Sequence, residues 1–126
     1  MATSHTSCIR IETANPNRDG TGTTEIGWAA LSSGGYVERI WINAVTATTQ
    51  GMIRVYYHDG AAFFLLREIP VQPSNPTAII PNWEHRIEFV SSHSIGFIMN
   101  KASSQTLRFS TERAETFDIV TEGWDL

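Results

Sequence analysis

The sequence has little cysteine, little lysine and no long apolar segment. Its single cysteine, Cys8, cannot form an internal disulfide, which excludes a small secreted scaffold held together by cysteine pairs. The longest uninterrupted apolar run covers only residues 61–66, and residues 1–7 lack the basic and apolar regions of a secretion signal. We therefore expect no membrane segment and a fold that rests on its own hydrophobic core.

The chain also lacks a surplus of positive charge. Its 126 residues include 9 basic and 13 acidic side chains, for a formal net charge of −4, and all the basic residues but Lys101 are arginines. This balance gives no electrostatic reason to expect a nucleic-acid ligand, and scattered arginines are typical of pairing with carboxylates. A hydrophobic content of 41% with 17% charged residues excludes a disordered chain. We expect a polar N-terminal arm over residues 1–7 and a single domain over residues 8–126.

Apolar residues recur mainly with a period of two, which is the spacing of β-strands. The pattern predicts about nine short antiparallel strands, at residues 8–12, 23–31, 36–45, 51–58, 61–71, 83–89, 95–99, 106–110 and 117–121. Short strands separated by frequent turn signals are typical of a β-sandwich or barrel. The sequence therefore predicts an all-β fold, specifically a β-sandwich with a jelly-roll-like topology.

Individual positions within these strands give sharper expectations. The Asp59-Gly60 pair tolerates the positive φ of a tight turn, so it predicts a hairpin between the strands on either side. Alternation after Pro81 places His85 on the apolar face of its strand, where we expect a hydrogen-bonded core or interface histidine. Cys8, at the start of a strand, is expected to be a small buried hydrophobe.

One loop resembles part of a calcium site. Asn15, Asn17 and Asp19, followed by Gly20, match the first half of a calcium-binding loop, in which oxygen ligands stand two residues apart. The second half does not match, because Ile26 stands where the bidentate glutamate belongs. The preferred interpretation is a loop whose Asn and Asp side chains cap their own backbone. We therefore expect no metal and no cofactor.

The sequence lacks the common catalytic motifs. It contains no Gly-x-Ser-x-Gly turn, its glycine-rich residues 19–24 lack the ending of a phosphate loop, and its four histidines lack zinc-ligand spacing. Two carboxylate pairs, Glu84 with Glu88 and Glu112 with Glu115, leave glycoside hydrolysis as an alternative. On an all-β chain such pairs usually belong to a solvated face, so we predict that the protein is not an enzyme.

Aromatic residues offer a better functional signal than the carboxylates. Four tryptophans, three tyrosines and six phenylalanines exceed what a minimal core requires. Tyr36, Trp41, Tyr56 and Tyr57 fall on both faces of the predicted strands, so a subset could form a sugar-stacking platform or a protein interface. The alternative is that they fill the core between the two sheets.

Several segments resemble a family of small structural proteins of tailed bacteriophages. The shared motifs are an N-x-N-R-D-G-T-G loop, a G-M-[IV]-R-[LV]-[FY]-x-H-D-G strand, an Arg-Glu-Ile strand, and a C-terminal segment with a glycine–aspartate tail. In this chain they correspond to residues 15–23, 51–60, 67–69, 107–120 and 123–126. The resemblance assigns Asn17, Arg18, Asp19 and Gly20 the structural role of a fixed turn, and it identifies no partner-binding residues.

The resemblance implies a protein of the virion, assembled in the host cytoplasm. The expected role is that of a capsid decoration or cement protein, which binds the major capsid protein or other virion subunits and stabilises the assembled head. Binding to the assembled shell but not to loose subunits would shift the assembly equilibrium toward the shell. We expect a homo-oligomer, preferably a trimer. The alternative is a tail- or fibre-associated adhesion module that binds host glycan through exposed Trp and Tyr.

Overall fold

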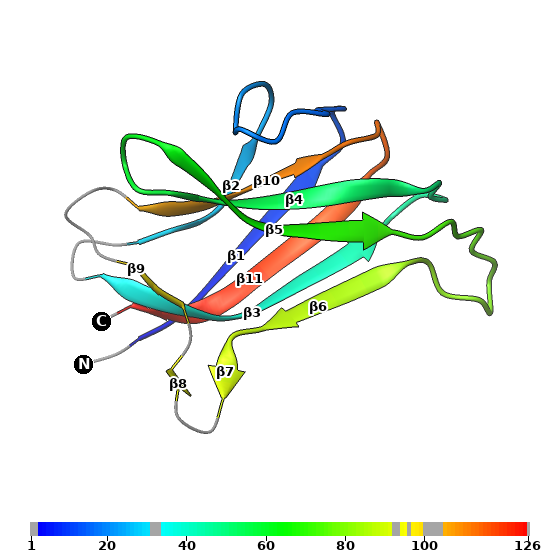
Figure 1. Ribbon diagram of the computed structural model, residues 1–126. Coiled ribbons are helices and arrows are strands. Elements are labelled where there is room, and N and C mark those ends of the chain that lie inside the picture. The colour runs from blue at the N-terminus through cyan, green and yellow to red at the C-terminus, as the bar shows by residue number, and fades with distance from the viewer. Residues whose placement is uncertain (1–2, 31–33, 92–93, 96, 100–104, 126) are drawn as a thin grey trace.

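The computed structural model describes residues 3–30, 34–91, 94–95, 97–99 and 105–125, and every regular element in these ranges is a β-strand (Figure 1). The strands are β1 (Thr3–Ile11), β2 (Glu25–Ala29), β3 (Gly35–Ala44), β4 (Gly51–His58), β5 (Phe63–Val71), β6 (Glu84–Glu88), β7 (Val90–Ser91), β8 (Ser94–Ile95), β9 (Phe97–Met99), β10 (Thr106–Thr111) and β11 (Phe117–Asp125). Parts of four predicted segments lie outside the described residues, at positions 1–2, 31, 96 and 126.

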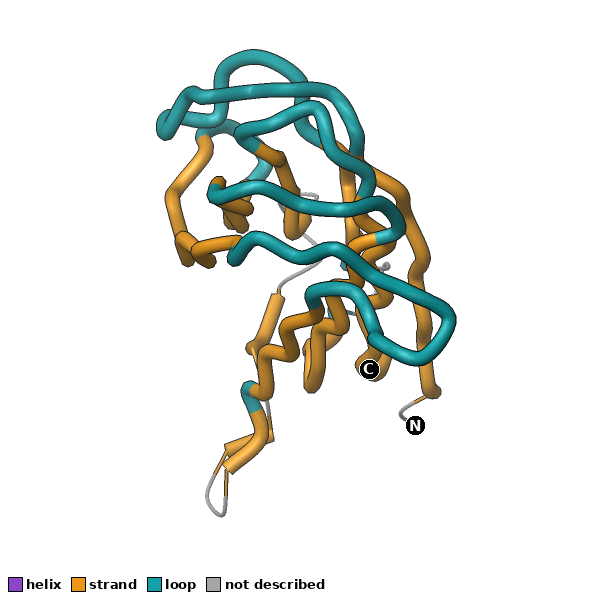
Figure 2. The backbone as a smooth tube through the Cα atoms, turned by 90° about the vertical axis from the view of Figure 1, so that its right-hand side faces the viewer, coloured by secondary structure: helices purple, strands orange, loops and turns teal. Residues whose placement is uncertain are grey.

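Two antiparallel sheets form the body of the molecule. Sheet A has the order β1-β11-β3-β6, with β9 also paired to β3, and sheet B has the order β2-β10-β4-β5. The short strands β7 and β8 pair only with each other. Figure 2 views the sheets from the side and shows the two strand layers, with several connecting loops gathered at one end. The predicted all-β fold and the β-sandwich architecture are therefore confirmed.

Strand pairing links segments that are far apart in the sequence. β11 lies between β1 and β3, and β10 lies between β2 and β4. Only β4 and β5 are neighbours both along the chain and in sheet B. Because most connections pass from one sheet to the other, both sheets need nearly the whole chain to form.

The core consists of the inward-facing side chains of both sheets. In β3 the predicted alternation holds, since Ile40, Ile42 and Ala44 are buried while Asn43 is exposed. The largest fully buried apolar or aromatic side chains are Trp28, Tyr56, Phe109, Phe117, Ile40, Ile42, Ile53, Ile87, Leu107 and Ile119. Burial of such side chains supplies the main favourable term in folding.

The predicted hairpin is present between β4 and β5. Their register runs from Gly51 opposite Val71 to His58 opposite Phe63, so residues 59–62 form the connection. Gly60 has φ +100°, and the Asp59 carboxylate accepts hydrogen bonds from the backbone N–H groups of Ala61 and Ala62. These N–H groups, Ala62 first, lower the pKa of Asp59. The strand begins at Phe63 rather than at residue 61 because both alanines belong to the turn.

The expected N-terminal arm is largely a strand. β1 begins at Thr3, and its residues up to Ser7 pair with β11 from Thr121 to Asp125. The pairing is possible because β11 continues four residues beyond its predicted end. Gly123 permits this continuation, since a Cβ atom there would lie 2.1 Å from the Tyr36 carbonyl oxygen.

Two burial predictions are wrong. Cys8 is exposed, because its neighbours Ile9 and Ile11 take the inward positions of β1. His85 lies on the apolar face of its strand as predicted, since it stands opposite the buried Ile42. It is nevertheless exposed rather than in the core, because β6 is an edge strand of sheet A, and its ring stacks on Trp83 at a centroid distance of 6.2 Å.

Candidate functional site

Arg54 connects strands β4, β5 and the end of β10. Its neighbours Ile53 and Val55 occupy core positions, so Arg54 faces the outer side of sheet B. It is nevertheless only 1% exposed. Its Nε donates to Glu68 Oε2 at 3.0 Å and its Nη2 donates to Glu112 Oε1 at 3.2 Å. We call Arg54, Glu68, Glu112 and Arg18 the arginine cluster. Arg18 joins it by donating to Glu68 Oε2 at 2.8 Å.

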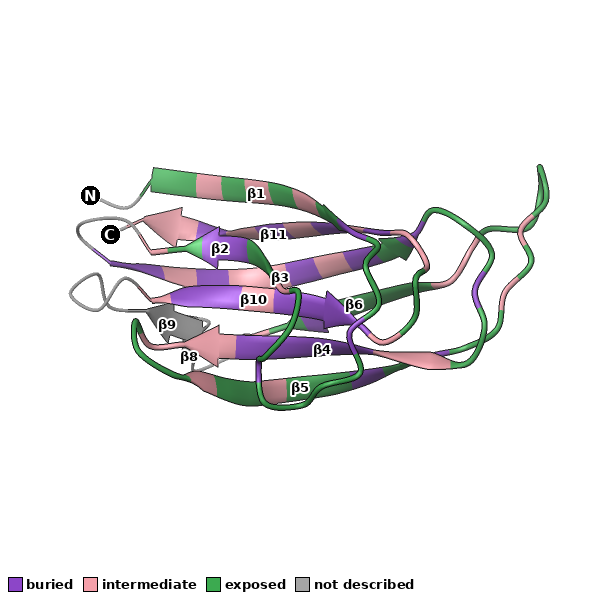
Figure 3. Ribbon diagram, turned by 90° about the horizontal axis from the view of Figure 1, so that it is seen from above, coloured by how far each residue is buried: buried purple, intermediate pink, exposed green. Residues whose placement is uncertain are grey.

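The loop between β1 and β2 covers this part of sheet B. Figure 3 shows it crossing from β1 over β10 and β4 toward β5 before it returns to β2. The Tyr56 hydroxyl donates to the Asn17 carbonyl at 2.8 Å, so the loop is bound to β4. Gly20, at φ +87°, lies so close to Phe63 that a Cβ atom would approach the Phe63 ring to 2.2 Å. The loop therefore shields Arg54 and requires glycine at position 20.

The loop is held in shape by its own side chains. Asn15 is 2% exposed, its Nδ2 donates to the carbonyls of Thr21 and Thr23, and its Oδ1 accepts from the Asn17 N–H. Asp19 Oδ1 accepts from both the hydroxyl and the backbone N–H of Thr21, which lowers the pKa of Asp19. The predicted capping of the backbone by Asn and Asp side chains is thus confirmed.

The same bonds engage two of the side-chain oxygens that the sequence offered for calcium. Asn15 Oδ1 and Asp19 Oδ1 accept from backbone N–H groups, and Asn17 Nδ2 donates to the Thr21 carbonyl. Within the described ranges no group of three or more His, Cys, Asp or Glu side chains could hold a metal ion. Asn15, Asn17 and Asp19 all form hydrogen bonds within the turn.

The electrostatics of the arginine cluster favour a permanent ion pair. Hydrogen bonds from Arg18, and next from Arg54, lower the pKa of Glu68. A carboxyl group kept ionised in this way is a poor general acid or base near neutral pH, because such catalysis needs a pKa close to the working pH. The cluster is therefore suited to holding strands and loop together rather than to proton transfer.

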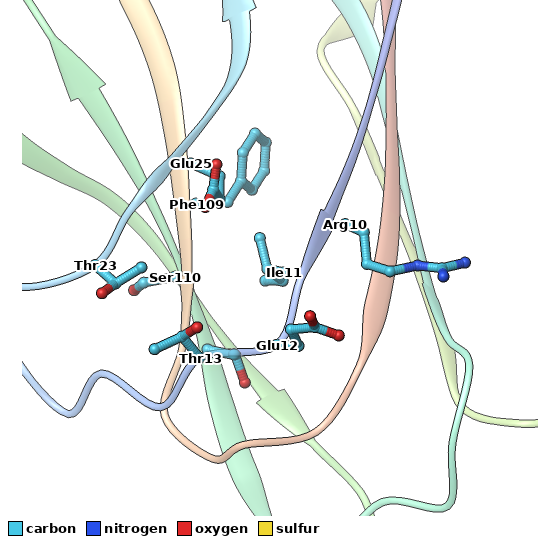
Figure 4. Close-up of a pocket in the computed structure, with 9 residues that line it drawn as sticks. Arg10, Ile11, Glu12, Thr13, Thr23, Glu25, Phe109 and Ser110 are labelled. Carbon is cyan, nitrogen blue, oxygen red and sulfur yellow. The ribbon is translucent and has the colours of Figure 1, made fainter.

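A small recess lies where β1 ends and β2 begins. Its volume is about 110 Å³, and its polar lining includes Glu12, Thr23, Glu25 and Ser110. Figure 4 shows Thr23 and Ser110 side by side, whereas the Arg10 side chain points away from the recess. Arg10 instead makes two hydrogen bonds to Asp118. Ligand pockets usually reach a few hundred Å³, so this recess has room for only a few water molecules.

The outer face of sheet A is a second candidate surface. Its cross-strand rows are Arg10–Asp118–Asn43–Glu84, Cys8–Val120–Trp41–Arg86 and Thr6–Glu122–Arg39–Glu88. The Arg86 guanidinium lies 4.9 Å from the Trp41 ring centroid. Beside them is a hollow of about 390 Å³, lined by Trp41, Asn43, Glu84, His85 and Arg86. We call it the Trp41 hollow.

Two further surfaces expose apolar side chains. The loop between β5 and β6 presents Ile79 at 92% and Ile80 at 55% exposure, and we call this pair the isoleucine tip. The unpaired edge of β5 exposes Phe64 and Leu65, at 53% and 41%. Contiguous exposed apolar side chains often mark interaction sites.

The aromatic residues singled out in the sequence have different environments. Tyr56 is fully buried beneath the loop and Tyr57 packs against the core. Tyr36 is half-buried, and Trp41 lies on the outer face of sheet A. Only Trp41 of these four combines a position in a hollow with neighbouring polar side chains.

The candidate carboxylate pairs are engaged separately. Glu112 pairs with Arg54, whereas Glu115 accepts two hydrogen bonds from Thr49. Glu88 pairs with Arg86, and the Glu84 carboxylate makes no hydrogen bond or ion pair with the described residues. Sequence reasoning did not single out Arg54. The available signal was an arginine between apolar residues in a strand, which is unusual unless the charge is paired.

Within the part of the chain that the structure describes, there is no helix long and apolar enough to cross a membrane. No protein-family model matches the sequence, and no similar protein was found among curated proteins or solved structures.

Proposed function

We propose that the chain is a non-enzymatic structural protein of a phage virion, which decorates the assembled head and stabilises it. The motifs that resemble the phage family support this proposal, because they meet in space. Asn17 and Arg18 of the first motif contact Tyr56 and Glu68 of the next two, and Glu112 of the C-terminal motif contacts Arg54. Motifs that meet in an ion-pair cluster are signatures of a fold rather than of a catalytic site.

The strand order supports a jelly-roll topology for the sandwich. When β7, β8 and β9 are set aside, eight strands remain, and the two sheets contain them in the orders 1-8-3-6 and 2-7-4-5. Strands with these orders are nested around the β4–β5 hairpin, like one long antiparallel hairpin rolled into two sheets. Jelly rolls are common among capsid proteins, which agrees with a virion role.

The isoleucine tip is the observation that most favours docking to another protein. Thr77 fixes it, since its backbone N–H donates to the Ile80 carbonyl at 3.0 Å and its Oγ1 accepts from the Ile79 and Ile80 N–H groups. Pro76 and Pro81 flank it and restrict the backbone further. A preformed apolar projection loses little conformational entropy on binding.

The base of this loop is also fixed. Thr48 and Ser74 exchange backbone hydrogen bonds, and Asn82 Nδ2 donates to the Thr46 carbonyl at 2.6 Å. The tip is thus attached to the body of the sandwich on both sides. We propose that it enters an apolar socket on the capsid surface.

The edge of β5 favours contact between copies of the chain. Phe64 and Leu65 expose apolar surface on an edge strand, whose open edge natural proteins usually cover or blunt. Pro70 lacks an N–H and blunts the other half of the same edge. A closed homo-oligomer, for which we propose a trimer, would cover the apolar half.

Binding to purified heads tests the docking proposal. Heads and tails from the parent phage are incubated with the added protein and sedimented, and bound protein is quantified. We expect saturable binding to heads and not to tails, and at least about a tenfold loss of affinity in an Ile79→Ser/Ile80→Ser variant. Val45→Ser, at another exposed apolar residue, is the control. Binding to tails alone, or binding that the tip variant retains in full, would contradict the proposal.

A further inference from the structure

The Trp41 hollow combines an aromatic ring with polar groups that have no partner in the protein. Trp41 lies on β3, and Asn43 stands opposite Glu84 on β6. Neither the Asn43 amide nor the Glu84 carboxylate makes a hydrogen bond or an ion pair among the described residues. Most other charged side chains of this face are paired, as in Arg10–Asp118 and Arg39–Glu122. Free planar polar groups are thus concentrated beside the indole.

One face of the indole is covered by an arginine side chain. The Arg86 guanidinium lies over that face, 4.9 Å from the ring centroid. Arg86 and its partner Glu88 are about half exposed, at 53% and 44%, so their ion pair is screened by solvent and is readily displaced. A ligand can therefore share or replace the position of the guanidinium over the ring.

These groups match the chemistry of a sugar ring. One face of a pyranose carries C–H bonds, which pack on the electron-rich face of an aromatic ring, while its hydroxyls need planar donors and acceptors around the rim. We propose that the Trp41 hollow binds a neutral saccharide, with a C–H face against Trp41 and hydroxyl groups bonded to Asn43 and Glu84. The volume of about 390 Å³ is at the low end for ligand sites and suits one or two sugar rings.

The charges around the hollow favour a neutral ligand over an acidic one. Arg86 is already compensated by Glu88, and the Glu84 carboxylate adds a negative charge. Burial, and next the nearby Arg67, lower the pKa of His85, which disfavours the charged form of its imidazole. The lining therefore has no free positive charge to attract a carboxylate or sulfate on a sugar.

Saturation-transfer NMR tests this proposal with defined sugars. Maltose, lactose and diacetylchitobiose are the neutral probes, and sialyl-lactose is the acidic relative of lactose. We expect saturation transfer to at least one neutral disaccharide, with weaker transfer to sialyl-lactose than to lactose. We also expect an affinity loss of about tenfold or more in Trp41→Ala.

The variants separate this site from a general effect on the fold. Trp124→Ala, at another tryptophan of sheet A, is the matched control and should retain binding. Asn43→Ala/Glu84→Ala changes only exposed side chains, so it should lose binding with an unchanged unfolding temperature. The proposal is overturned by no transfer to any neutral sugar, by binding that survives in Trp41→Ala, or by stronger transfer to sialyl-lactose. A further result would also overturn it: the wild-type protein binds no sugar and is an oligomer, and Trp41→Ala dissociates that oligomer.

Discussion

At the scale of single residues, Arg54 is buried while its partners are not. Its side chain is 1% exposed, whereas the side chains of Glu68 and Glu112 are 32% and 37% exposed. If the arginine is removed, water can solvate both carboxylates. If the carboxylates are removed, the guanidinium stays buried without a counter-charge, and its Nη1 already lacks a hydrogen-bond partner.

We therefore predict an asymmetry between the two sides of the cluster. Glu68→Ala/Glu112→Ala should lower the free energy of unfolding by about 3–5 kcal/mol, because it strands a buried charge. Arg54→Met should cost less, roughly 1–2 kcal/mol, because it leaves solvated carboxylates and a side chain of similar length. Urea denaturation with unchanged m-values measures both. Arg18→Ala, at an exposed pair, is the control and should cost less than about 1 kcal/mol. Equal losses for the first two variants would contradict this account.

The lowered carboxyl pKa values also set how stability depends on pH. The pKa values of Glu68 and Asp118 are lower in the folded state, chiefly through hydrogen bonds from Arg18 and Arg10. Their stabilisation is therefore complete above the ordinary carboxyl pKa of about 4 and is lost as the pH falls through the lowered values. We predict that the unfolding temperature falls steeply below about pH 4, and that Glu68→Gln reduces this slope. Thermal melts between neutral pH and acid check it; an identical acid slope in the variant would refute the assignment.

Residue by residue, the sequence predicted local conformation better than burial. Asp59-Gly60 and the Asn15–Asp19 caps depend only on neighbouring atoms, so their signals are complete in the sequence. The burial of Arg54 depends on a loop that approaches from another part of the chain, and the exposure of His85 depends on β6 being an edge. The Trp41 hollow likewise needs β3 and β6 to be adjacent, which no local pattern indicates.

At the scale of elements, the β1–β2 loop acts as a cover for sheet B. Asn15 is the centre of this cover, because its buried side chain binds the backbone at three points. Asn17 makes one longer side-chain bond, at 3.3 Å, from an exposed position. The two asparagines therefore form a natural test pair.

We predict that Asn15→Ala lowers the free energy of unfolding by about 2–3 kcal/mol, because it removes three hydrogen bonds made by a buried side chain. Asn17→Ala should cost less than about 1 kcal/mol, since water can replace its exposed bond. Hydrogen exchange of the amides in residues 15–24 should show local opening only in the first variant. Similar exchange in both variants would mean that Asn15 does not hold the loop.

The alternation of apolar and polar residues predicts some strand boundaries correctly but not others. β4 was predicted with its observed bounds, since a strong apolar pattern ends at the Asp59-Gly60 turn. β1 and β11 both extend beyond their predicted limits, because the outer half of β1 is polar and pairs with the end of β11, which also pairs with β3. Polar strands of this kind are defined by backbone hydrogen bonds rather than by a buried face, so periodicity does not reveal them.

At the scale of the whole molecule, two pairs of consecutive exposed apolar side chains lie outside the core among the described residues. The isoleucine tip and the β5 edge involve different residues, so the proposed head contact and the proposed contact between copies can be separated by mutation.

We predict that the protein is an oligomer, a trimer in our proposal, and that Phe64→Ser/Leu65→Ser makes it monomeric. The substitutions remove apolar surface from an edge and leave the core unchanged, so the circular dichroism spectrum should stay the same. Light scattering coupled to size-exclusion chromatography gives the mass of each form. Ile79→Ser/Ile80→Ser is the matched control and should keep the oligomeric mass. A wild-type protein that is already monomeric would exclude this interface.

The central claim, that the chain decorates and stabilises a phage head, is tested most directly by electron cryomicroscopy of virions with and without the protein. The account predicts that virions lacking it lose discrete density on the outer head surface and release their DNA at a lower temperature, and that added protein restores both. A head with unchanged density and unchanged heat resistance in the absence of the protein would contradict the claim.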